Sequence, residues 1–531
     1  MKQCLAAVLI ICLCVLASCF FGCVEDASRN SCYFDGSASE GGDGTLKSPF
    51  NSPDDVKKIN FNEVSEVLFK RGTEFFGSWV FANLDGVTIG DYGEGSLPVL
   101  NGNDCAGVAV LTLENCRNTT VKNLEICDSA TEEDDRRGVL VNVFNPNDDS
   151  DEVITYENIT LTELFVHDIR GIVDAEKFGM TRQSKVTGGI HVWSSDGLGR
   201  CDGLEISHCV IENVDNVGIA TWFVPQLGRE NKNSPYSEEF SALAHKNVRI
   251  AYNDVSNIGK NAIFARNLLG GVVEHNTVYD TASRCRAGNS ICTSGVFGTV
   301  VQFNEGYRNN AIQKDGCMLD ADIMSRETIW QYNYSHDNAF GLFVNCTLFD
   351  EESKTADSVI VRFNLSVNDY GGDGENGGII YVNYKVSSLE IYNNTIFVPS
   401  GVSPVILRSK NNRNFSFFNN LIVCYSQTAS FVMGEQSATS ISNNLFYNAS
   451  NGKLFGEDTF VAANTNGIYV DPQLCAAAGL TLEARIGFKS TSFCKLGATS
   501  AALGRGIRVE DVTSDFFGNA YSQGIGCCVG I

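Results

Sequence analysis

An Asn set between hydrophobic residues recurs at nearly even spacing over the second half of the chain, and this repeat limits the possible folds more than any other feature. It stands at eight positions separated by 23 to 31 residues, namely Asn253, Asn276, Asn304, Asn333, Asn364, Asn394, Asn420 and Asn444. Between them, runs of four to six residues alternate between apolar and polar and are separated by Gly, Asn or Asp, which is typical of strands and turns. A unit of this length cannot bury its own apolar side, so the repeat predicts stacked units that share one core.

We therefore predict an all-β solenoid in which one coil follows another and the repeated Asn side chains form a buried ladder of amides. Residues 30–105 are expected to form an N-terminal cap with the first strands, and residues 105–450 the solenoid itself. The repeat is lost over residues 451–531, which are expected to form a C-terminal cap.

Residues 1–23 have the features of an export signal, with Lys2, an apolar run over residues 5–16 and then small residues. The segment Leu16-Ala-Ser-Cys19 also resembles a bacterial lipobox, in which Cys19 would carry a lipid, whereas an ordinary signal would be cut near residues 23–27. The apolar run is shorter than the about 20 residues of a comfortable membrane span. We expect an exported protein, either secreted or a cell-surface lipoprotein, that meets the membrane only through this lipid.

The net charge of −24, from 39 basic and 63 acidic residues, disfavours nucleic acid as a partner. An exported chain can oxidise close cysteine pairs, and the 20 Cys offer three candidates without fixing the connectivity: Cys201 with Cys209, Cys285 with Cys292, and Cys475 with Cys494. No Cys-x-x-Cys occurs, which gives a zinc or thioredoxin-like site little support.

We expect the protein to be a monomer.

A second set of short runs can be aligned beside the Asn repeat, at residues 189–193, 218–222, 262–266, 290–293, 316–320, 341–345, 378–383 and 405–408. Because side chains alternate across a strand, four residues are expected to point into the core, namely Ile190, Val192, Cys317 and Leu319. Nine polar or aromatic residues then point outward, namely His191, Trp193, Trp222, Arg266, Asp320, Asp322, Asn345, Arg408 and Lys410. The alignment stacks Asn345 directly over Asp320, and long insertions at 174–188 and 224–246 border this face.

Three segments resemble right-handed parallel β-helix proteins of the pectin-lyase-like superfamily. They are the opening CYFDGSASEGGDGTLKSPF with VLFKRGTEFFGSW, the central DGCMLDAD with WQYNYSHDN, and the closing DFFGN with IGCCV. The resemblance implies a right-handed parallel β-helix with a cap at each end, in an exported protein that acts on polysaccharide. The polygalacturonase signatures Asn-Thr-Asp and Gly-His-Gly and the pectate lyase signature Trp-Ile-Asp-His are absent. No catalytic residue is therefore carried over from those families.

Asp320 and Asp322 are the sharpest candidates for chemistry. At positions i and i+2 of one strand their Cα atoms lie about 6.6 Å apart, which suits the carboxylate pair of either a retaining or an inverting glycosidase. One carboxyl would be the acid/base and the other the nucleophile, or the general base of an inverting enzyme. Both could instead bind Ca²⁺, which prefers oxygen ligands. A solvated acidic edge is the alternative without function.

The remaining outward residues have a functional and a structural interpretation each. His191 is either an acid/base or a structural residue. Trp193 and Trp222 either stack on sugars or pack beneath the two insertions. Arg266, with Arg408 and Lys410, either neutralises a uronate carboxylate or serves solubility. Asn345 is expected among the substrate-binding residues of the same face.

Three functions remain in competition. The first is an exported glycoside hydrolase that uses Asp320 and Asp322 and needs no cofactor. The second is a Ca²⁺-dependent polysaccharide lyase that acts on uronates, in which Arg266 or a Lys removes the proton. The third is a surface or adhesion β-helix without catalysis. For either enzyme the partner is a polysaccharide, bound on the outward face between the two insertions, whereas the adhesion protein would bind a glycan or a host surface without turnover.

Overall fold

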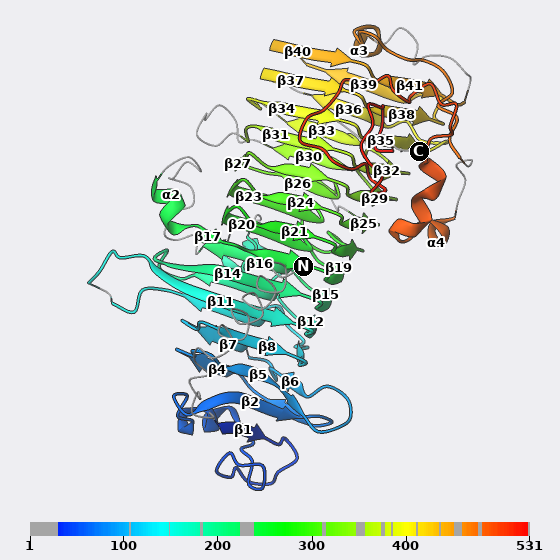
Figure 1. Ribbon diagram of the computed structural model, residues 1–531. Helices are drawn as coiled ribbons and strands as arrows, with labels where there is room; N and C mark the ends of the chain where they lie inside the picture. Colours follow the sequence, from blue (N-terminus) through cyan, green and yellow to red (C-terminus); the bar gives the residue numbers. More distant parts are fainter. Residues whose placement is uncertain are drawn as a thin grey trace, which may run out of the picture.

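The computed structural model describes residues 30–105, 108–147, 149–180, 184–223, 238–310, 315–346, 356–372, 377–383, 386–409, 413–434, 437–450, 459–475 and 481–528. These residues form a right-handed parallel β-helix, whose coils stack from β1 (Asn30–Phe34) at one end to β41 (Leu445–Asn448) at the other (Figure 1). The predicted fold class is confirmed. The export signal and Cys19 lie outside the described residues.

Each coil contributes strands to three faces, and the strands of successive coils pair in parallel. The first face carries the aligned runs of the candidate site. It consists of β4 (Trp79–Ala82), β7 (Ala109–Glu114), β10 (Arg137–Val143), β13 (Gly188–Ser194), β16 (Val217–Phe223), β20 (Ile263–Leu269), β23 (Ile291–Phe297), β26 (Leu319–Ala321), β30 (Phe343–Cys346), β33 (Ile380–Asn383), β36 (Val405–Ser409) and β39 (Ser430–Met433).

The second face leads into the turn with the repeated Asn. It consists of β1, β2 (Val64–Lys70), β5 (Thr88–Tyr92), β8 (Thr119–Lys122), β11 (Ile154–Thr162), β14 (Gly199–Ser207), β18 (Arg249–Ala251), β21 (Val272–Glu274), β24 (Val300–Gln302), β28 (Ile329–Gln331), β31 (Val359–Arg362), β34 (Leu389–Tyr392), β37 (Arg413–Phe418) and β40 (Ser437–Ser442). The short β17 (His245–Lys246) and β27 (Ser325–Arg326) lie at the bend between the first two faces, since both pair with first-face strands.

The third face follows that turn. It consists of β3 (Glu74–Phe76), β6 (Val99–Asn101), β9 (Glu125–Asp128), β12 (Phe165–Ile169), β15 (Val210–Val214), β19 (Asp254–Ile258), β22 (Thr277–Tyr279), β25 (Glu305–Tyr307), β29 (Tyr334–His336), β32 (Leu365–Val367), β35 (Thr395–Val398), β38 (Leu421–Cys424) and β41.

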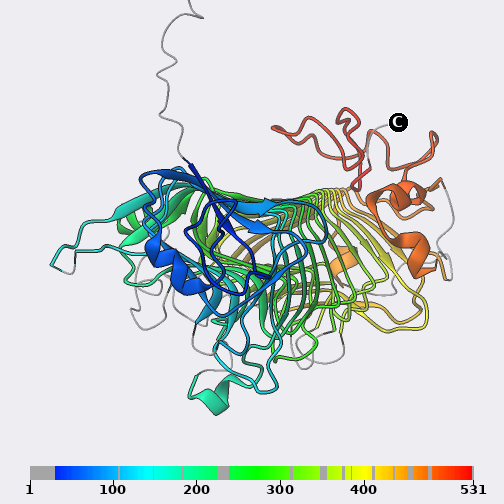
Figure 2. The ribbon, with the colours of Figure 1, turned by 90° about the horizontal axis from the view of Figure 1, so that it is seen from below.

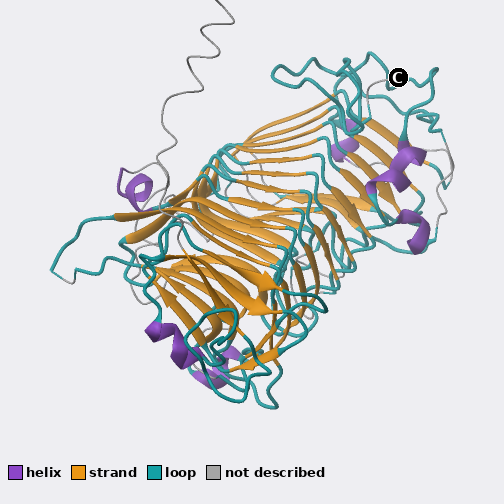
Figure 3. Ribbon diagram, turned by 60° about the horizontal axis from the view of Figure 1, so that its bottom comes forward, coloured by secondary structure: helices purple, strands orange, loops and turns teal. Residues whose placement is uncertain are grey.

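Helices lie outside the stack of strands (Figure 3). They are the 3₁₀ helices η1 (Pro53–Lys58), η2 (Ala175–Phe178) and η5 (Phe488–Cys494), and the short α2 (Glu238–Leu243), α3 (Thr459–Ala462) and α4 (Leu482–Arg485). Among the described residues, no helix has both the length and the apolar composition needed to cross a membrane.

The core is a set of apolar columns that run along the β-helix. On the first face, Ile219, Ile263, Ile291 and Leu319 stand at paired positions of four coils, and each is fully buried. Burying a side chain of this size contributes about 1.5–3 kcal/mol. Parallel pairing begins with β1 on β2, so the first rungs lie within the segment predicted as the N-terminal cap.

The repeated Asn residues form the predicted ladder. Asn304 accepts hydrogen bonds at its Oδ1 from the backbone N–H (3.0 Å) and the Nδ2 (2.9 Å) of Asn276, and its own Nδ2 donates to Asn333 Oδ1 (3.0 Å). The pattern runs from Asn253 to Asn464, one rung beyond the repeat that the sequence shows. Asn276, Asn304, Asn333 and Asn364 are at most 1% exposed, so the predicted buried column is confirmed.

A left-handed turn explains why the ladder needs Asn. The residue before each ladder position has a positive φ, as at Tyr252 (58°), Phe303 (54°) and Phe363 (53°). This turn removes the next backbone N–H from the sheet, and the Asn Oδ1 of the following coil accepts its hydrogen bond. A buried N–H without an acceptor would cost about 1–3 kcal/mol.

Residues 481–528 pack along the outside of the coils. Figure 2 shows this orange and red segment as a separate layer at one side of the stack. Arg485 binds Asp337 at 2.7 Å, and Gly487 donates its N–H to Glu305 at 2.6 Å. Further on, Asn393 Nδ2 donates to the carbonyls of Gly524 and Gly526. The end of the β-helix is covered by α3, where Phe460 packs on Phe417, Phe431 and Phe446.

All described cysteines are free thiols. The candidate pairs Cys201/Cys209, Cys285/Cys292 and Cys475/Cys494 are therefore not disulfides in this structure. Cys201 and Cys209 are both buried within the core of the β-helix, where they behave as small apolar side chains.

A shorter second ladder ends in a carboxyl group. Asn338 Oδ1 accepts the backbone N–H of Asn309 (3.0 Å), and Asp369 Oδ1 accepts the N–H (3.1 Å) and Nδ2 (3.0 Å) of Asn338. Ser335 and Ser366 donate their hydroxyls to Asp369 Oδ2. Burial raises the pKa of the Asp369 carboxyl to about 6, although these four donors oppose the shift.

We predict that Asn333→Ala lowers the thermal unfolding temperature strongly. The substitution leaves the backbone N–H and Nδ2 of Asn304 and the carbonyl of Val301 without their partner, and each buried orphan group costs about 1–3 kcal/mol. Asn62→Ala, in an exposed turn, is the matched control and should leave Tm nearly unchanged. Equal Tm values for the two variants would contradict the role of the ladder.

We predict that Asp369→Asn raises Tm at neutral pH. The folded pKa of about 6 exceeds the unfolded 3.8, so the folded state holds its proton longer and stability falls as pH rises from about 4 to 7. The introduced amide does not titrate, so the Asp369→Asn variant avoids this loss of folding free energy, which amounts to about 3 kcal/mol at most. The gain over the wild type should be small at pH 4 and largest at pH 7 in thermal melts. Asp337→Asn, which removes a partner of Arg485, should have the opposite effect.

Candidate active site

Two outward columns of the first face hold most of the residues that the sequence singled out. The strand register pairs His191 with Ala220, then Phe264, Cys292 and Asp320, and beyond them Val344, Tyr381 and Arg408. The neighbouring column runs through Trp193, Trp222, Arg266 and Ser294. The N–H of Asp322 donates to the carbonyl of Thr293 at 3.0 Å, which places Asp322 next in this column.

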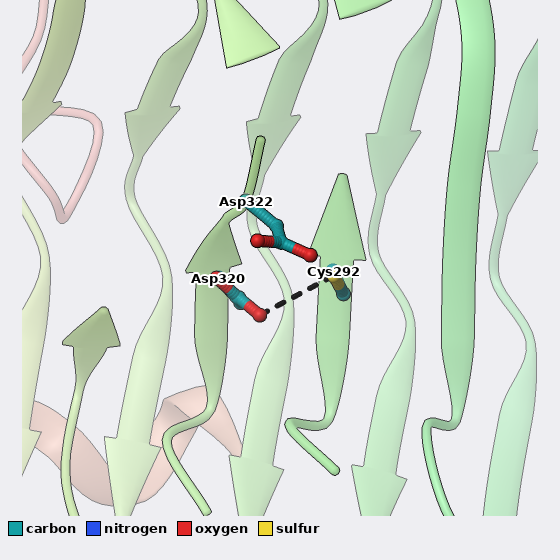
Figure 4. Close-up of side chains that lie close together, drawn as sticks. All are labelled: Cys292, Asp320 and Asp322. Atoms are coloured by element: carbon teal, nitrogen blue, oxygen red, sulfur yellow. Dashed lines mark hydrogen bonds between the residues drawn. The ribbon is translucent and has the colours of Figure 1, made fainter. Parts of the chain in front are cut away.

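Asp320 and Asp322 meet Cys292 at the centre of this face (Figure 4). One ligand atom from each of the three side chains lies within 4.8 Å of the other two. Cys292 donates its thiol to Asp320 Oδ2 at 3.3 Å. Asp320 is only 6% exposed, whereas Asp322 is partly exposed, so Asp322 is the member of the pair that a bound molecule can contact.

Asn289 holds the Asp320 carboxyl from one side. Its Nδ2 donates to Asp320 Oδ2 at 2.7 Å, and its Oδ1 accepts the backbone N–H groups of Gly316 and Cys317, both at 2.8 Å. The side chain is 3% exposed. Asn289 therefore connects the carboxyl group to the loop that follows Asp315.

The two carboxyls differ in their electrostatic surroundings. Burial, and then the charges of Asp322 and Asp315, raise the pKa of Asp320 well above its ordinary value, against the hydrogen bonds from Asn289 and Cys292. Burial also raises the pKa of Asp322, but the charges of Lys185 and Arg266 act against the shift. The arrangement favours a proton on Asp320 and a negative charge on Asp322.

Three basic side chains, Lys185, Arg266 and Lys260, interact electrostatically with the carboxyl groups. The Lys185 ammonium lies 4.7 Å from the ring centre of Phe264, and the Arg266 guanidinium lies 6.0 Å from the same ring. Both side chains are 9% exposed. Burial, and then the charge of Lys185, lower the pKa of Lys260 to about 7, while Asp315 acts against that shift. Asp315 is thus a third carboxylate of the same cluster.

The donor set does not suit Ca²⁺. Ca²⁺ takes six to eight oxygen ligands, whereas the three side chains with ligand atoms within 4.8 Å of one another offer a thiol sulfur together with two carboxyls. Burial and the charges of both aspartates raise the pKa of the Cys292 thiol well above its ordinary value, so it is protonated and a poor ligand. Lys185 and Arg266 already act on the charge of Asp322.

His191 lies on the expected column but away from the carboxyls. Four coils separate it from Asp320, about 19 Å at the usual spacing of parallel strands. It is fully buried and accepts a hydrogen bond from Trp193 Nε1 at 3.3 Å. Burial, and then the nearby Arg137, lower its pKa to about 3, so the imidazole is neutral. The structure supports the structural interpretation of His191 over the catalytic one.

Trp193 points outward as predicted, but a cation covers its ring. The Arg137 guanidinium lies 4.2 Å from the ring centre, and Arg137 also donates to the carbonyl of Val186 at 2.7 Å. Trp193 packs at the edge of a small apolar cluster with Met180 and Val186 of the first insertion. These contacts match the interpretation in which the tryptophan packs beneath the insertion.

Two predicted orientations are wrong by one residue. Asn345 pairs with Ala321 rather than Asp320, is fully buried and donates its Nδ2 to the carbonyl of Ala321 at 2.9 Å, so it faces the core and cannot bind substrate. Val344 takes the place beside Asp320. Cys317 belongs to an outer apolar cluster with Val344 and Tyr381 instead of pointing inward.

Arg408 stands on the outward column as predicted, three coils beyond Asp320, and its Nε donates to the carbonyl of Gly377 at 2.8 Å. The strand position of Trp222 beside Trp193 is described, but its side chain is not. Lys410 lies outside the described residues.

Five residues of the site were not singled out from the sequence as members of it, namely Lys185, Lys260, Asn289, Cys292 and Asp315. Lys185 lies in the insertion at 174–188, which was expected to border the face, and Asn289 directly precedes the aligned run at 290–293. The sequence thus placed both residues near the face, but it did not show which residues they contact. The contact between Asn289 and Asp320 joins residues 31 positions apart, on neighbouring coils.

Proteins that are similar to this chain include two lacto-N-biosidases. No family model matches the chain. The lacto-N-biosidase of Bifidobacterium longum subsp. longum is 26% identical over 415 residues, which cover 69% of this chain. The match covers 24% of that relative, so the chain spans about a quarter of its length.

The solved structure of the GH136 lacto-N-biosidase from Eubacterium ramulus superimposes with a TM-score of 0.56 at 20% sequence identity. The alignment covers 76% of this chain and 68% of that chain. The likeness agrees with the parallel β-helix described above, over most of both chains.

Proposed function

We propose that this chain is an exported glycoside hydrolase. The observation that carries the proposal is the cluster of partly buried carboxyls on the first face, in a chain that is 26% identical to a lacto-N-biosidase over 415 residues. Two carboxyl groups with separated pKa values are what glycoside hydrolysis needs. The signal-like residues 1–23 support export, with lipidation at Cys19 or simple cleavage as its two forms.

We assign Asp322 the role of nucleophile. It is partly exposed, and Lys185 and Arg266 favour its charged form. The carboxyl oxygens of Asp320 and Asp322 lie within 4.8 Å. Inverting enzymes need about 6.5–9.5 Å to hold a water between the two groups, whereas retaining enzymes need about 5–5.5 Å. With Asp320 as the acid, the spacing supports a retaining reaction, in which the sugar is first transferred to Asp322 and then to water.

The proton for the leaving group comes from a second carboxyl. Asp320 is the nearer one and holds a proton through its raised pKa, but it is 6% exposed. Asp315 is partly exposed, and its charge acts on Asp320. An acid/base group must reach the glycosidic oxygen, so the separate Asn variants of these two residues decide which one gives a proton to the leaving group.

The name of the relative directs the choice of substrate. Lacto-N-biosides are the first compounds to test, followed by a panel of plant, algal and host glycans. The surroundings of Asp322 suit an uncharged sugar, because its neighbouring cations already act on a carboxylate. A uronate-specific lyase would need cationic groups left over for the substrate carboxylate.

We predict that Asp322→Asn lowers kcat by about 10³-fold or more, because the nucleophile is lost. Release of p-nitrophenol from a p-nitrophenyl lacto-N-bioside measures the rate, and proton NMR of the first product measures its anomeric configuration, which a retaining enzyme preserves. Folding should persist, since the side chain is partly exposed. Asp54→Asn, whose side chain is 87% exposed, is the matched control. A wild-type rate for Asp322→Asn would leave the cluster without a catalytic role.

We predict that a chelator leaves the wild-type rate unchanged, because the donor set does not suit Ca²⁺ and Lys185 and Arg266 already favour the charge of Asp322. Rates are measured before and after EDTA, and the products are scanned for ultraviolet absorption. Loss of activity with EDTA, its return with Ca²⁺, and absorbing products would replace the hydrolase by the lyase. Binding of glycans without turnover would support the adhesion protein instead.

A further inference from the structure

Asn289, like Asn338 beside Asp369, is a buried asparagine whose Nδ2 donates to an aspartate carboxyl. Most ladder asparagines donate their Nδ2 to another amide and to backbone carbonyls, as Asn304 does toward Asn333 and Val273. Asn216, close to the first face, donates to the carbonyl of Ile172. Asn289 instead donates to the Asp320 carboxyl, and its Oδ1 accepts two backbone N–H groups.

The hydrogen bonds fix which way the amide points. Gly316 and Cys317 present N–H donors, so the atom that faces them must be the carbonyl oxygen of Asn289. The NH₂ group then faces Asp320 and donates at 2.7 Å. A flipped amide would oppose donor to donor on one side and acceptor to acceptor on the other, so only one orientation satisfies the site.

The two N–H groups follow Asp315 directly, in a part of the loop where the backbone φ is positive. Asp315 has φ 67° and Gly316 has φ 112°, both in the region that most residues avoid. Such a conformation persists where the surroundings hold it. The Oδ1 of Asn289 supplies that restraint to the backbone that carries Asp315, while its Nδ2 restrains Asp320.

We propose that Asn289 is a positioning residue, which fixes the Asp315 loop and the Asp320 carboxyl relative to each other through opposite ends of one side-chain amide. The proposal rests on the hydrolase function, since it concerns the same carboxyl cluster. Asn289 contacts the Asp320 carboxyl and the backbone that follows Asp315, and it acts on a substrate only through these two carboxyl-bearing groups. A displacement of either one by about 1 Å would cost a factor of about 10² in rate.

Two substitutions separate the two ends of the amide. Asn289→Asp keeps an oxygen for the N–H groups of Gly316 and Cys317 but places a second oxygen against Asp320 Oδ2, where a donor stood. Asn289→Ala removes both contacts. Asn216→Ala, which deletes another buried amide outside the carboxyl cluster, is the control for lost stability alone.

The expected result is a fall in kcat with little change in KM. Asn289→Asp should lower kcat about tenfold and Asn289→Ala about 10²-fold, each with KM within about twofold. Asn216→Ala should lower Tm through the loss of its bond to the carbonyl of Ile172 and should keep kcat. Wild-type kcat in both Asn289 variants would overturn the proposal. The same would follow if Asn216→Ala lowered kcat as much, because the effect would then be general destabilisation.

Infrared spectra of protein labelled with ¹³C-aspartate give a readout that does not need turnover. The band of the Asp320 carboxyl is identified by its loss in Asp320→Asn, and it should shift in Asn289→Ala because its donor is gone. A shift in a chain that hydrolyses no glycan would keep the positioning role and reject the hydrolase. An unshifted band would overturn the proposal whether or not the chain is active.

Discussion

The hydrogen bond from one Asn to the next along the β-helix is the interaction on which the rest of the structure depends. Each left-handed turn takes a backbone N–H out of the sheet, and the Oδ1 of the following Asn accepts it at about 3.0 Å, from Asn253 to Asn464. The ladder therefore fixes the height of each coil from β18 onward relative to its neighbours. Register on the first face follows from it, because a strand held at its far turn cannot slip by one residue without breaking a rung. The geometry of the carboxyl site therefore depends on the Asn ladder, which lies at another edge of the coil.

Burial of the two carboxyl groups raises their pKa values and so determines their protonation. Removing Asp320 from water opposes its charge, and the neighbouring charges of Asp322 and Asp315 add to that effect. Removing Asp322 has the same sign, but Lys185 and Arg266 lie close enough to act against it. Two carboxyls with oxygens within 4.8 Å thus come to differ in protonation through their neighbours rather than through their own type. The buried amide of Asn289 then sets the orientation of the group that carries the proton.

The sequence predicted the fold well because each Asn of the repeat occupies one position of the ladder. It also predicted that His191, Trp193 and Asp320 share one outward face, since alternation within their strands is regular. It failed at Asn345 and Cys317. β30 begins at Phe343 and β26 at Leu319, so alternation counted from the preceding glycines starts too early, and Met318 and Leu319 both enter the core. Because side chains alternate with a period of two residues, an error of one residue in the register moves a side chain to the opposite face of the strand. Lys185 and Asn289 could not be placed, because their contacts with Asp322 and Asp320 depend on how distant segments fold over the coils.

The balance of charge at the site favours a glycoside hydrolase over a polysaccharide lyase. The chain as a whole carries −24, yet the carboxyl cluster has cations for partners, with Lys185 and Arg266 acting on Asp322 and Lys260 facing the charge of Asp315. A lyase must hold the uronate carboxylate with positive charge that the protein does not use itself. Here an added carboxylate would compete with Asp322 for the same two side chains. An uncharged sugar brings no such competition and leaves Asp322 ionised beside its cations, which is the state that a nucleophile requires.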